Sequence, residues 1–445
     1  VEVKYTWTNA PEKLNQLSVF LKYPRWNSPM DDYTEWWDKS EVGKIIDTYY
    51  KAGGMYCRGE GGVGKTEIIK GIDEICKDNA EKLKLMREEL KDRDDKELII
   101  KEWKETHPCF LTKLAPTNKA CNNIGGKTLH RGLGLRVCKG IDDDSDSDDE
   151  EENKQDNSYR MDRLISNLEK NKPDIMPVDE ISMINGEGWS ALSYIKQRIP
   201  SIKFFLFGDI QRQLPPVGED DRMFEDTICM KELTNYNKLE LKYNFRRQTA
   251  DTNTLWDKCA NHPETFEVKE APLTYRNLCW TNQTRKEVID KIQNIHPNPE
   301  LWLDCASKTE REDVNNTGQN ERLMLAVGVP LIARKSMTIR KKSADGKEKK
   351  QIIAKNEIWK VKSVGEEIVL EYKDREESFT QEEIRKKWLS AFCITIHKSQ
   401  GDTYRDEYTI WDWDRISKRR DLQAKKLRYT AVSRSVDYER LVKFK

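Results

Sequence analysis

The sequence lacks long apolar runs, paired cysteines and a cysteine–histidine pattern. No apolar stretch approaches the roughly 18 residues of a membrane span, and no secretory signal opens the chain. The ten cysteines include no CxxC pair, and the five histidines do not stand beside them at metal-ligand spacing. These absences argue against a membrane partner, a disulfide framework and a zinc site, and they favour a reducing compartment. We therefore expect a soluble, intracellular protein, in the nucleus or the cytoplasm.

Apolar residues are scarce at 36% and charged residues abundant at 35%, against about 45–50% (a value that also counts Gly) and about 25% in an average soluble domain. The 445 residues allow several domains of roughly 100–200 residues. The 78 basic and 78 acidic residues cancel, but residues 142–152 hold nine acids and no base. Such a tract buries too little apolar surface to fold, so we expect disorder there. Residues 331–445 carry 29 basic and 19 acidic residues, which predicts a polyanionic partner for this part.

A glycine-rich segment, Gly-Glu-Gly-Gly-Val-Gly-Lys-Thr at residues 59–66, matches the phosphate-binding pattern GxxxxGK[ST]. A short strand-like segment precedes it and apolar residues at helical spacing follow it, which is the order that the mechanism requires. The glycines let backbone N–H groups surround phosphates, the Lys65 ammonium reaches the β and γ phosphates, and the Thr66 hydroxyl ligates Mg²⁺. The predicted nucleotide-binding residues are Gly59, Gly61, Gly62, Val63, Gly64, Lys65 and Thr66.

Two acids end the next apolar run, IMPVDE at residues 175–180. At a strand end downstream of a phosphate loop, Asp179 is expected to hold Mg²⁺ and Glu180 to polarise the attacking water. Pro177 lies inside this predicted strand and lacks a backbone donor, so we expect irregular pairing there. A further run at 202–209 also ends in an acid, Asp209. Strands alternating with helices predict a parallel sheet that binds ligands at its carboxyl edge.

Other segments predict additions to this sheet. Residues 77–106 are rich in Lys, Glu and Asp with a weak apolar stripe, Leu83, Met86 and Leu90, and are expected to form a solvated helical insertion. IWKVKSV and EEIVLEY, between residues 358 and 372, predict two strands of a small β module. The basic stretch 334–350 beside it is either a solvated loop or a nucleic-acid contact.

The order of these blocks resembles superfamily 1 helicases of subgroup B, closest to the PIF-like and RecD-like group. The matching blocks are 59–66, 115–120 (motif Ia), 126–130, 179–183 (motif II), 208–217 (motif III), 244–246 (motif IV), 395–401 (motif V) and 429–434 (motif VI). Motif III carries one extra residue, which leaves Gln211 and Gln213 as candidates for sensing the γ-phosphate, and we prefer Gln213 because it directly precedes Leu-Pro-Pro-Val. Arg246 and Arg247 compete similarly in motif IV. Gln16 is only a poor counterpart of the family's adenine-contacting glutamine. The Lys- and Asn-rich composition also resembles versions from large eukaryotic DNA viruses or mobile elements.

The resemblance implies an α/β fold with two RecA-like P-loop domains with parallel sheets, plus small inserted subdomains that include an SH3-like β module. The expected division is an N-terminal extension (1–40), a first RecA-like domain (41–130 and 173–240), a small insertion with the acidic tract (131–172), a second RecA-like domain (241–335 and 389–445) and the SH3-like insertion (336–388). Because the chain begins at Val1 rather than Met, we expect a trimmed chain or a fragment of a longer polypeptide. ATP with Mg²⁺ would lie between the two domains and contact Gly401. The implied catalytic residues are Lys65, Asp179, Glu180, Gln213, Arg246 and Arg434, with the two arginines acting from the second domain.

The function implied is an ATP-dependent DNA helicase that moves 5′ to 3′ on single-stranded DNA, unwinds duplexes and acts as a monomer at single-strand/duplex junctions, with other replication or repair proteins as further partners. The residues expected to hold the nucleic acid are Pro116, Thr117, Asn118, Thr128, His130, Thr395, His397, Lys398 and Ser399. An RNA helicase of the same superfamily and a scaffold that binds nucleotide without turnover are the alternatives. The Leu-Pro-Pro-Val and His-Lys-Ser-Gln-Gly segments favour the DNA branch, and intact Lys65, Asp179, Glu180 and Arg434 argue against the scaffold.

Overall fold

The computed structural model describes residues 39–133, 162, 164–170, 172–216, 227–246, 253–268, 274–296, 299–305, 322–342 and 348–445. These residues divide into a first and a second compact unit, and the division falls between Trp256 and Asp257. Residues 1–38, which include Gln16, the acidic tract 142–152 and Val217 lie outside the described residues. Within the described part of the chain, no helix is both long and apolar enough to cross a membrane.

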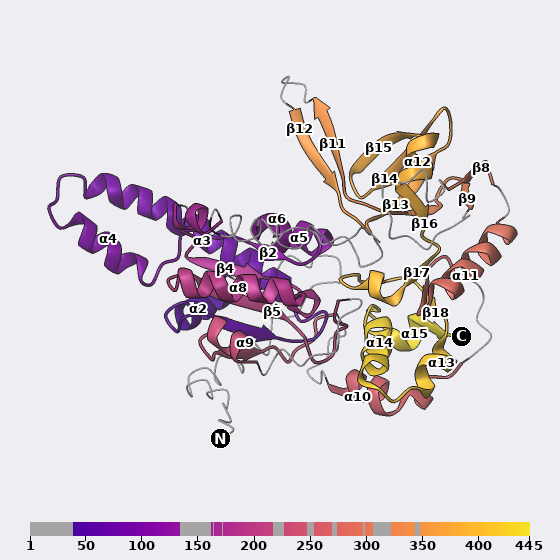
Figure 1. Ribbon diagram of the computed structural model, residues 1–445, viewed down its shortest axis with the longest axis horizontal. Coiled ribbons are helices and arrows are strands. Elements are labelled where there is room, and N and C mark those ends of the chain that lie inside the picture. The colour runs from indigo at the N-terminus through magenta and orange to yellow at the C-terminus, as the bar shows by residue number, and fades with distance from the viewer. Residues whose placement is uncertain are drawn as a thin grey trace, which may run out of the picture. The chain divides into compact units, whose positions relative to one another are not determined.

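The first unit is built on a six-stranded sheet in the order β3-β2-β4-β5-β1-β6 (Figure 1). All neighbouring strands are parallel, as the alternation of predicted strands and helices requires. The strands are β1 (Met55–Arg58), β2 (Leu114–Ala115), β3 (Lys127–Thr128), β4 (Ile175–Val178), β5 (Lys203–Gly208) and β6 (Lys238–Glu240). The loops that carry the predicted ATP site follow β1, β4 and β5, so they all leave the sheet at its carboxyl edge.

Helices cover both faces of this sheet, because successive side chains of each strand point to opposite faces. Along β5, Phe205 and Phe207 pack into one apolar cluster with α2, α3 and α5, whereas Phe204 and Leu206 pack into another with α6, α8 and α9. The helices of this unit are α2 (Lys39–Tyr49), α3 (Lys65–Glu89), α4 (Lys96–Lys104), α5 (Asn118–Ile124), α6 (Leu129–Leu133), η2 (Ile181–Met183), α8 (Gly186–Arg198) and α9 (Ile228–Leu233).

Pro177 disturbs the sheet on one side only. Towards β5 the register is continuous, from Ile175 opposite Lys203 to Val178 opposite Leu206. Towards β2 the Ile175 and Asp179 amides donate to the Phe110 and Leu114 carbonyls, and Pro177, which lies between them, has no amide hydrogen to donate. The ladder between β2 and β4 is accordingly reduced to Leu114 opposite Val178. The irregular pairing predicted from the sequence is thus confirmed and lies on the β2 side.

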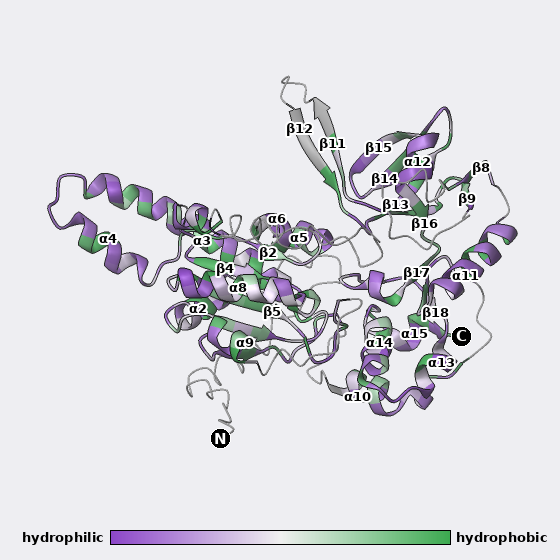
Figure 2. Cartoon of the chain, in the orientation of Figure 1, coloured by the Kyte–Doolittle hydropathy of each residue, from purple (hydrophilic) through white to green (hydrophobic). Residues whose placement is uncertain are grey.

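The predicted helical insertion is confirmed. The second half of α3 and the whole of α4 extend beyond the sheet, and Figure 2 shows this projection as largely hydrophilic. Its small core consists of Leu83, Ile100 and Cys109, and the predicted stripe residues Met86 and Leu90 pack against it. This core is separate from the two clusters of the sheet.

The second unit contains a four-stranded parallel sheet in the order β17-β7-β18-β19. Its strands are β7 (Asn277–Cys279), β17 (Cys393–Thr395), β18 (Tyr408–Ile410) and β19 (Val442–Phe444), and its helical segments are η4 (Pro263–Thr265), α11 (Asn282–Ile295), η6 (Ile396–Ser399), α13 (Trp413–Lys418), α14 (Leu422–Val432) and α15 (Tyr438–Leu441). Helix α10 (Asn253–Asn261) spans the boundary between the units. In the second unit, the buried Arg428 guanidinium donates hydrogen bonds to four carbonyls, those of Cys259, Ala260, Ile416 and Arg419. It thereby ties the end of α10 to the end of α13.

The predicted β module is an antiparallel five-stranded sheet in the order β15-β14-β13-β10-β16, accompanied by the β11–β12 hairpin. The strands are β10 (Pro330–Ala333), β11 (Met337–Lys342), β12 (Glu348–Ile353), β13 (Ile358–Ser363), β14 (Glu367–Tyr372), β15 (Arg375–Thr380) and β16 (Trp388–Ser390), with α12 (Gln381–Lys387) before β16 and a separate pair, β8 (Leu301–Asp304) and β9 (Arg322–Leu325). The expected range 336–388 leaves out β10 and all of β16 except Trp388. Leu331 of β10 pairs with both Trp359 and Ser390, so these two strands complete the sheet.

All nine described cysteines are free thiols, and all except Cys229 are buried. Burial raises the pKa of Cys57, Cys76 and Cys121 to about 12 and that of Cys109 to about 11.

Candidate active site

The phosphate loop joins β1 to α3, as the sequence predicts. Gly62 and Gly64 have φ angles of 98° and 83°, a left-handed conformation that glycine adopts without strain. The Lys65 side chain is buried at the start of α3, and its Nζ donates to the carbonyls of Gly59 at 2.5 Å and Glu60 at 2.7 Å. The loop therefore has its cation and the amino end of a long helix at one place, a combination that favours phosphate.

Asp179 lies directly beside this loop. The Thr66 Oγ1 donates to Asp179 Oδ2 at 3.1 Å, and the Glu180 amide donates to Asp179 Oδ1 at 2.9 Å. Burial raises the pKa of Asp179, and the negative charge of the neighbouring Glu180 raises it further. Glu180 itself has φ 52°, a left-handed conformation that costs energy in a residue with a side chain.

The Thr66 and Asp179 oxygens fit a magnesium ion. Both are hard oxygen ligands, and a cation between them would offset the cost of burying the Asp179 charge. Within the described residues no cluster of three or more His, Cys, Asp or Glu side chains could hold a metal by itself. A Mg²⁺ ion at Thr66 and Asp179 would thus share its coordination with phosphate oxygens and water, as this ion usually does.

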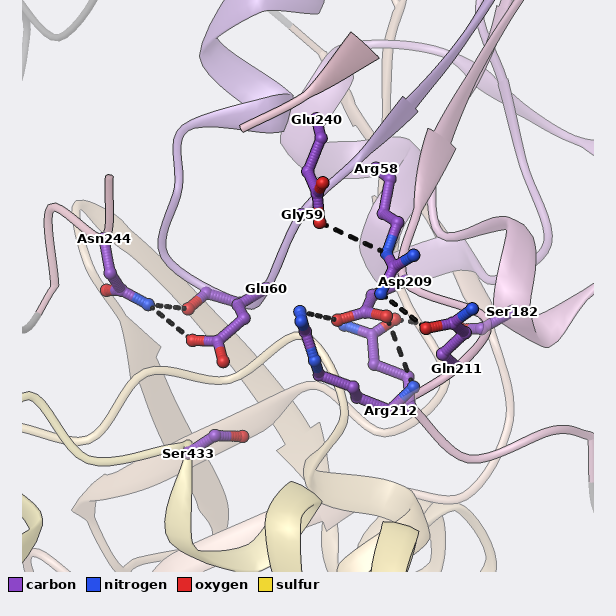
Figure 3. Close-up of polar contacts among 12 residues, drawn as sticks. Arg58, Gly59, Glu60, Ser182, Asp209, Gln211, Arg212, Glu240, Asn244 and Ser433 are labelled. Carbon is purple, nitrogen blue, oxygen red and sulfur yellow. Dashed lines mark hydrogen bonds and ion pairs between the residues drawn. The ribbon is translucent and has the colours of Figure 1, made fainter. Parts of the chain in front are cut away.

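The loop after β5 separates the two glutamines that the sequence left open. Gln213 is buried, and its Oε1 accepts from Ser182 Oγ at 2.9 Å, two residues beyond Glu180. Gln211 instead accepts a hydrogen bond from Arg58 of β1, whose Nε also lies 3.8 Å from a Glu240 carboxylate oxygen (Figure 3). Gln213 is thus the glutamine that contacts the Glu180 segment.

The Asp209 carboxylate is fully buried and accepts from Arg212 Nη1 at 3.2 Å (Figure 3). A buried charge of this kind needs a partner. Arg212 therefore fixes the turn that carries the two glutamines.

Arg246 is placed differently from the expectation. Residues 244–246 were assigned to the second RecA-like domain, but they belong to the first unit and lie on the phosphate loop. The Phe245 amide donates to the Gly62 carbonyl at 2.9 Å, and the Arg246 amide donates to the same oxygen at 3.4 Å. The reason is that β6 pairs with β1 and the Leu241 amide still donates to Arg58, so the chain continues along β1 towards the loop. An Arg246 that acts on the nucleotide would act from the unit that holds the phosphate loop.

In the first unit, the predicted nucleic-acid residues follow β2 and β3 at the carboxyl edge of the sheet. The Thr117 hydroxyl caps α5 by accepting from the Ala120 amide at 3.2 Å, with Pro116 before it and Asn118 after it. The Thr128 hydroxyl accepts from the Arg131 amide at 3.2 Å, next to the half-buried His130. These residues therefore share one edge of the sheet.

In the second unit, Thr395 ends β17, and the half-buried His397 and Lys398 lie in the short η6 turn after it. Burial lowers the pKa of His397. Ser399 is fully buried and donates to the Ile396 carbonyl at 2.7 Å, so its hydroxyl serves the turn itself. Gly401 follows with φ 80°.

Arg434 is also buried. Its Nε donates to the Thr430 carbonyl at 3.0 Å, and its Nη2 donates to Ser433 Oγ at 3.1 Å. These contacts hold the guanidinium against the end of α14.

Sequence reasoning missed two residues of the site, Glu60 and Asn244. Both are fully buried, and Asn244 Nδ2 donates to Glu60 Oε2 at 3.2 Å (Figure 3). The sequence alone could have drawn attention to Glu60, because a carboxylate between the glycines of a phosphate loop is unexpected beside an anionic ligand. The partner was not visible, since the two residues are 184 positions apart.

Comparisons with known proteins agree with this geometry. Residues 43–219, which contain the phosphate loop, Asp179 and Gln213, match the family model of an AAA domain. Among curated proteins, none matches the chain significantly.

Solved structures extend the likeness beyond the AAA domain. Pif1 from Bacteroides bound to single-stranded DNA is 17% identical, with a TM-score of 0.54 and 92% of each chain covered. A Pif1 helicase from a study of DNA unwinding at forked double-stranded DNA is 18% identical, with a TM-score of 0.53 and 91% of each chain covered. The chain thus has the fold of the Pif1 helicases over more than nine-tenths of its length, which confirms the predicted fold class.

Proposed function

We propose that this chain is an ATP-dependent DNA helicase that moves 5′ to 3′ on single-stranded DNA and unwinds duplex DNA. The observation that carries the proposal is the contact between Thr66 and Asp179 at the carboxyl edge of a parallel sheet. This contact joins a phosphate loop to a magnesium-binding acid, in a chain that shares its fold with helicases bound to DNA.

Each residue at the loop has a distinct task in this proposal. Lys65 exchanges its bonds to the Gly59 and Glu60 carbonyls for phosphate oxygens, and the loop amides surround the phosphates. Thr66 and Asp179 would hold Mg²⁺, which would supply positive charge against the phosphates. Glu180 orients and polarises the attacking water, and Gln213 senses the γ-phosphate. Arg246 and Arg434 stabilise the negative charge of the transferring phosphoryl group, and Gly401 contacts the nucleotide.

The proposed nucleic-acid contacts lie at strand ends of both sheets. In the first unit, hydroxyl and amide groups of Thr117, Asn118 and Thr128 would bind phosphates next to Pro116 and His130. In the second unit, Thr395, His397 and Lys398 would do the same. The buried hydroxyl of Ser399 would support this turn from within, rather than contact the strand.

The decisive experiment is ATP hydrolysis measured with single-stranded DNA, with single-stranded RNA and without nucleic acid. We expect strong stimulation by DNA only, and we expect Lys65→Ala to abolish it because the phosphate contact is lost. Stimulation by RNA alone would favour the RNA helicase, and nucleotide binding without turnover would favour the scaffold.

Direction is tested with duplexes that carry a single-stranded tail at one end. A 5′ tail should allow unwinding and a 3′ tail should not. Efficient unwinding from the 3′ tail alone would contradict the proposed direction.

We further propose an intracellular protein that acts as a monomer at single-strand/duplex junctions, with other replication or repair proteins as partners. The support is that the nine cysteines of the described residues are all free thiols, which suits a reducing compartment.

A further inference from the structure

Residues 244–246 hold the tip of the phosphate loop through both backbone and side chains. Asn244 Nδ2 donates to Glu60 Oε2 at 3.2 Å and to the Gly61 carbonyl at 3.1 Å (Figure 3). The amides of the next two residues, Phe245 and Arg246, donate to the Gly62 carbonyl. Three consecutive loop residues are therefore bonded to three consecutive residues of the segment after β6.

Glu60 is an unusual residue for this place. Its side chain is 0% exposed, and a buried carboxylate is costly unless hydrogen bonds compensate for the lost water. Its negative charge also opposes the binding of an anionic nucleotide at the same loop. A carboxylate at this position disfavours nucleotide binding. We therefore look for its role in Asn244, the residue that donates a hydrogen bond to it.

The packing around Gly62 shows what is held. A Cβ atom placed on Gly62 would lie 2.6 Å from Arg246 Cβ and 3.3 Å from Arg246 Nε. The base of the guanidinium group thus lies against the loop itself. The same Cβ would lie 2.9 Å from Asn244 Oδ1, so Asn244 and Arg246 both lie against this one glycine.

We propose that Glu60 and Asn244 form a latch that positions Arg246 beside the phosphate loop, so that Arg246 contacts the terminal phosphate of a nucleoside triphosphate. Glu60 and Asn244 are positioning residues and do not touch the nucleotide through their side chains. This inference rests on the proposed ATP hydrolysis. It adds that discrimination between triphosphate and diphosphate is set within the first unit, through a hydrogen bond from Asn244 to an acid of the loop.

The test compares Glu60→Ala, Asn244→Ala and Arg246→Ala with the unchanged chain in two measurements. The first is the ratio of the dissociation constants for ADP and for a non-hydrolysable triphosphate analogue, which needs no turnover. The second is kcat for DNA-stimulated ATP hydrolysis. We expect all three variants to lose about 10- to 100-fold in kcat and a similar factor in the ratio, the scale of a hydrogen bond to a charged group. None of the three should lose ADP affinity, because the diphosphate lacks the group that Arg246 contacts, and Glu60→Ala should bind ADP at least as tightly as the unchanged chain because an opposing charge is removed.

A double variant separates positioning from a merely structural role. If the latch acts through Arg246, then Glu60→Ala added to Arg246→Ala should cause no further loss. Glu60→Gln keeps an acceptor oxygen for Asn244. Its ratio of the two dissociation constants should therefore stay close to that of the unchanged chain. The matched control is Glu74→Ala, which removes an exposed glutamate from α3 and should change neither measurement.

Two results would overturn the latch. The first is an equal loss of ADP and triphosphate affinity in Glu60→Ala, which would mean that Glu60 only keeps the loop folded. The second is additive losses in the double variant. Failure of the proposed ATP hydrolysis gives a different result, because the unchanged chain would then bind both nucleotides without hydrolysing ATP. The ratio of the two dissociation constants would still test the latch, since it needs no turnover.

Discussion

The two parallel sheets contain one junction that is nearly the same in sequence and in structure. In the first unit, β2 leads into α5 through Leu-Ala-Pro-Thr-Asn at 114–118, and in the second unit β7 leads into α11 through Leu-Cys-Trp-Thr-Asn at 278–282. In both, the threonine caps the helix by accepting from an amide three residues further on, at 3.2 Å. The strand–cap–helix geometry is thus common to both units.

The difference lies in what occupies the start of each helix. At α11, the Asp412 carboxylate accepts from the Trp280 amide at 3.1 Å and from Thr284 Oγ1 at 2.8 Å. The positive end of α11 is therefore already neutralised by an acid of its own unit. At α5, a neutral hydroxyl caps the helix and Lys119 adds a positive charge to the first turn. The junction in the second unit is thus closed by a carboxylate, whereas the first turn of α5 holds no acid, and it is there that we propose a phosphate of the strand to bind.

The largest expected effect on nucleotide binding comes from breaking the phosphate loop, the feature of the first unit that most separates it from the second. Gly62→Ala would place a methyl group 2.6 Å from Arg246 Cβ at a residue whose φ is 98°. We expect nucleotide affinity to fall by at least about 100-fold, measured by titration with a fluorescent ADP analogue. Gly365→Ala in the second unit, where the nearest atom is 3.6 Å away, should have no effect, and tight binding by Gly62→Ala would show that the loop relaxes.

Arg434→Ala tests the contribution of the second unit to turnover. If Arg434 stabilises the transferring phosphoryl group, hydrolysis should fall by roughly 10³-fold while ADP affinity stays. Because Arg434 is buried, thermal unfolding must be measured on the same samples. Arg440→Ala, at an exposed arginine, is the control, and an unchanged rate in Arg434→Ala would rule the finger out.

Glu180→Gln separates binding from chemistry within the first unit. The amide cannot polarise water as a carboxylate does, so turnover should fall by about 10²-fold or more. ATP binding should persist because Lys65, Thr66 and Asp179 remain. Nucleotide titration and single-turnover hydrolysis check this, with the exposed Glu232→Gln as control. Wild-type turnover would remove Glu180 from the mechanism.

The basic stretch 334–350 was predicted to be either a solvated loop or a nucleic-acid contact. The β11–β12 hairpin offers a way to distinguish the two. Arg340 lies opposite Lys350 and Lys341 opposite Lys349, so the register places these four basic residues in two facing positions of the hairpin. Changing these four residues to Gln should weaken DNA binding and lower the slope of log affinity against log salt by up to about 0.7 per lost phosphate contact. Four exposed lysines of the α3–α4 projection, Lys82, Lys84, Lys91 and Lys101, provide the charge-matched control. Equal slopes for both variants would leave the hairpin as a solvated element.

The smallest effect concerns the two caps themselves. Thr117→Ala and Thr281→Ala should each lower the free energy of unfolding of their unit by about 1 kcal/mol. Only Thr117→Ala should also weaken single-stranded DNA binding, since the α11 terminus is occupied by Asp412. Denaturant titration and DNA binding by fluorescence anisotropy test the pair, and an equal loss of DNA affinity in both would contradict the difference between the junctions.

The elements that could be predicted from the sequence are those with a local signal. The phosphate loop, β4 with its proline, the apolar stripe of the α3–α4 projection and the strands β13 and β14 follow from residue pattern and spacing. The place of Arg246 could not be predicted, because backbone hydrogen bonds to Gly62 decide it and these leave no mark on residue type. Ser399 was expected to contact DNA because a motif fixes which residue is present but not where its hydroxyl points. Glu60 was overlooked because the pattern treats its position as variable.

The buried cysteines have a practical consequence for measuring motion in this protein. A thiol reacts with a maleimide through its thiolate, and with pKa values of about 11 to 12 the buried Cys57, Cys76, Cys109 and Cys121 carry almost no thiolate at neutral pH. A cysteine introduced at Leu85, which is 64% exposed on the α3–α4 projection, would therefore react much faster than these four. The native fold thus protects these four thiols during labelling, so they can stay in place when a fluorescent probe is attached, whereas the partly exposed Cys229 has to be replaced first.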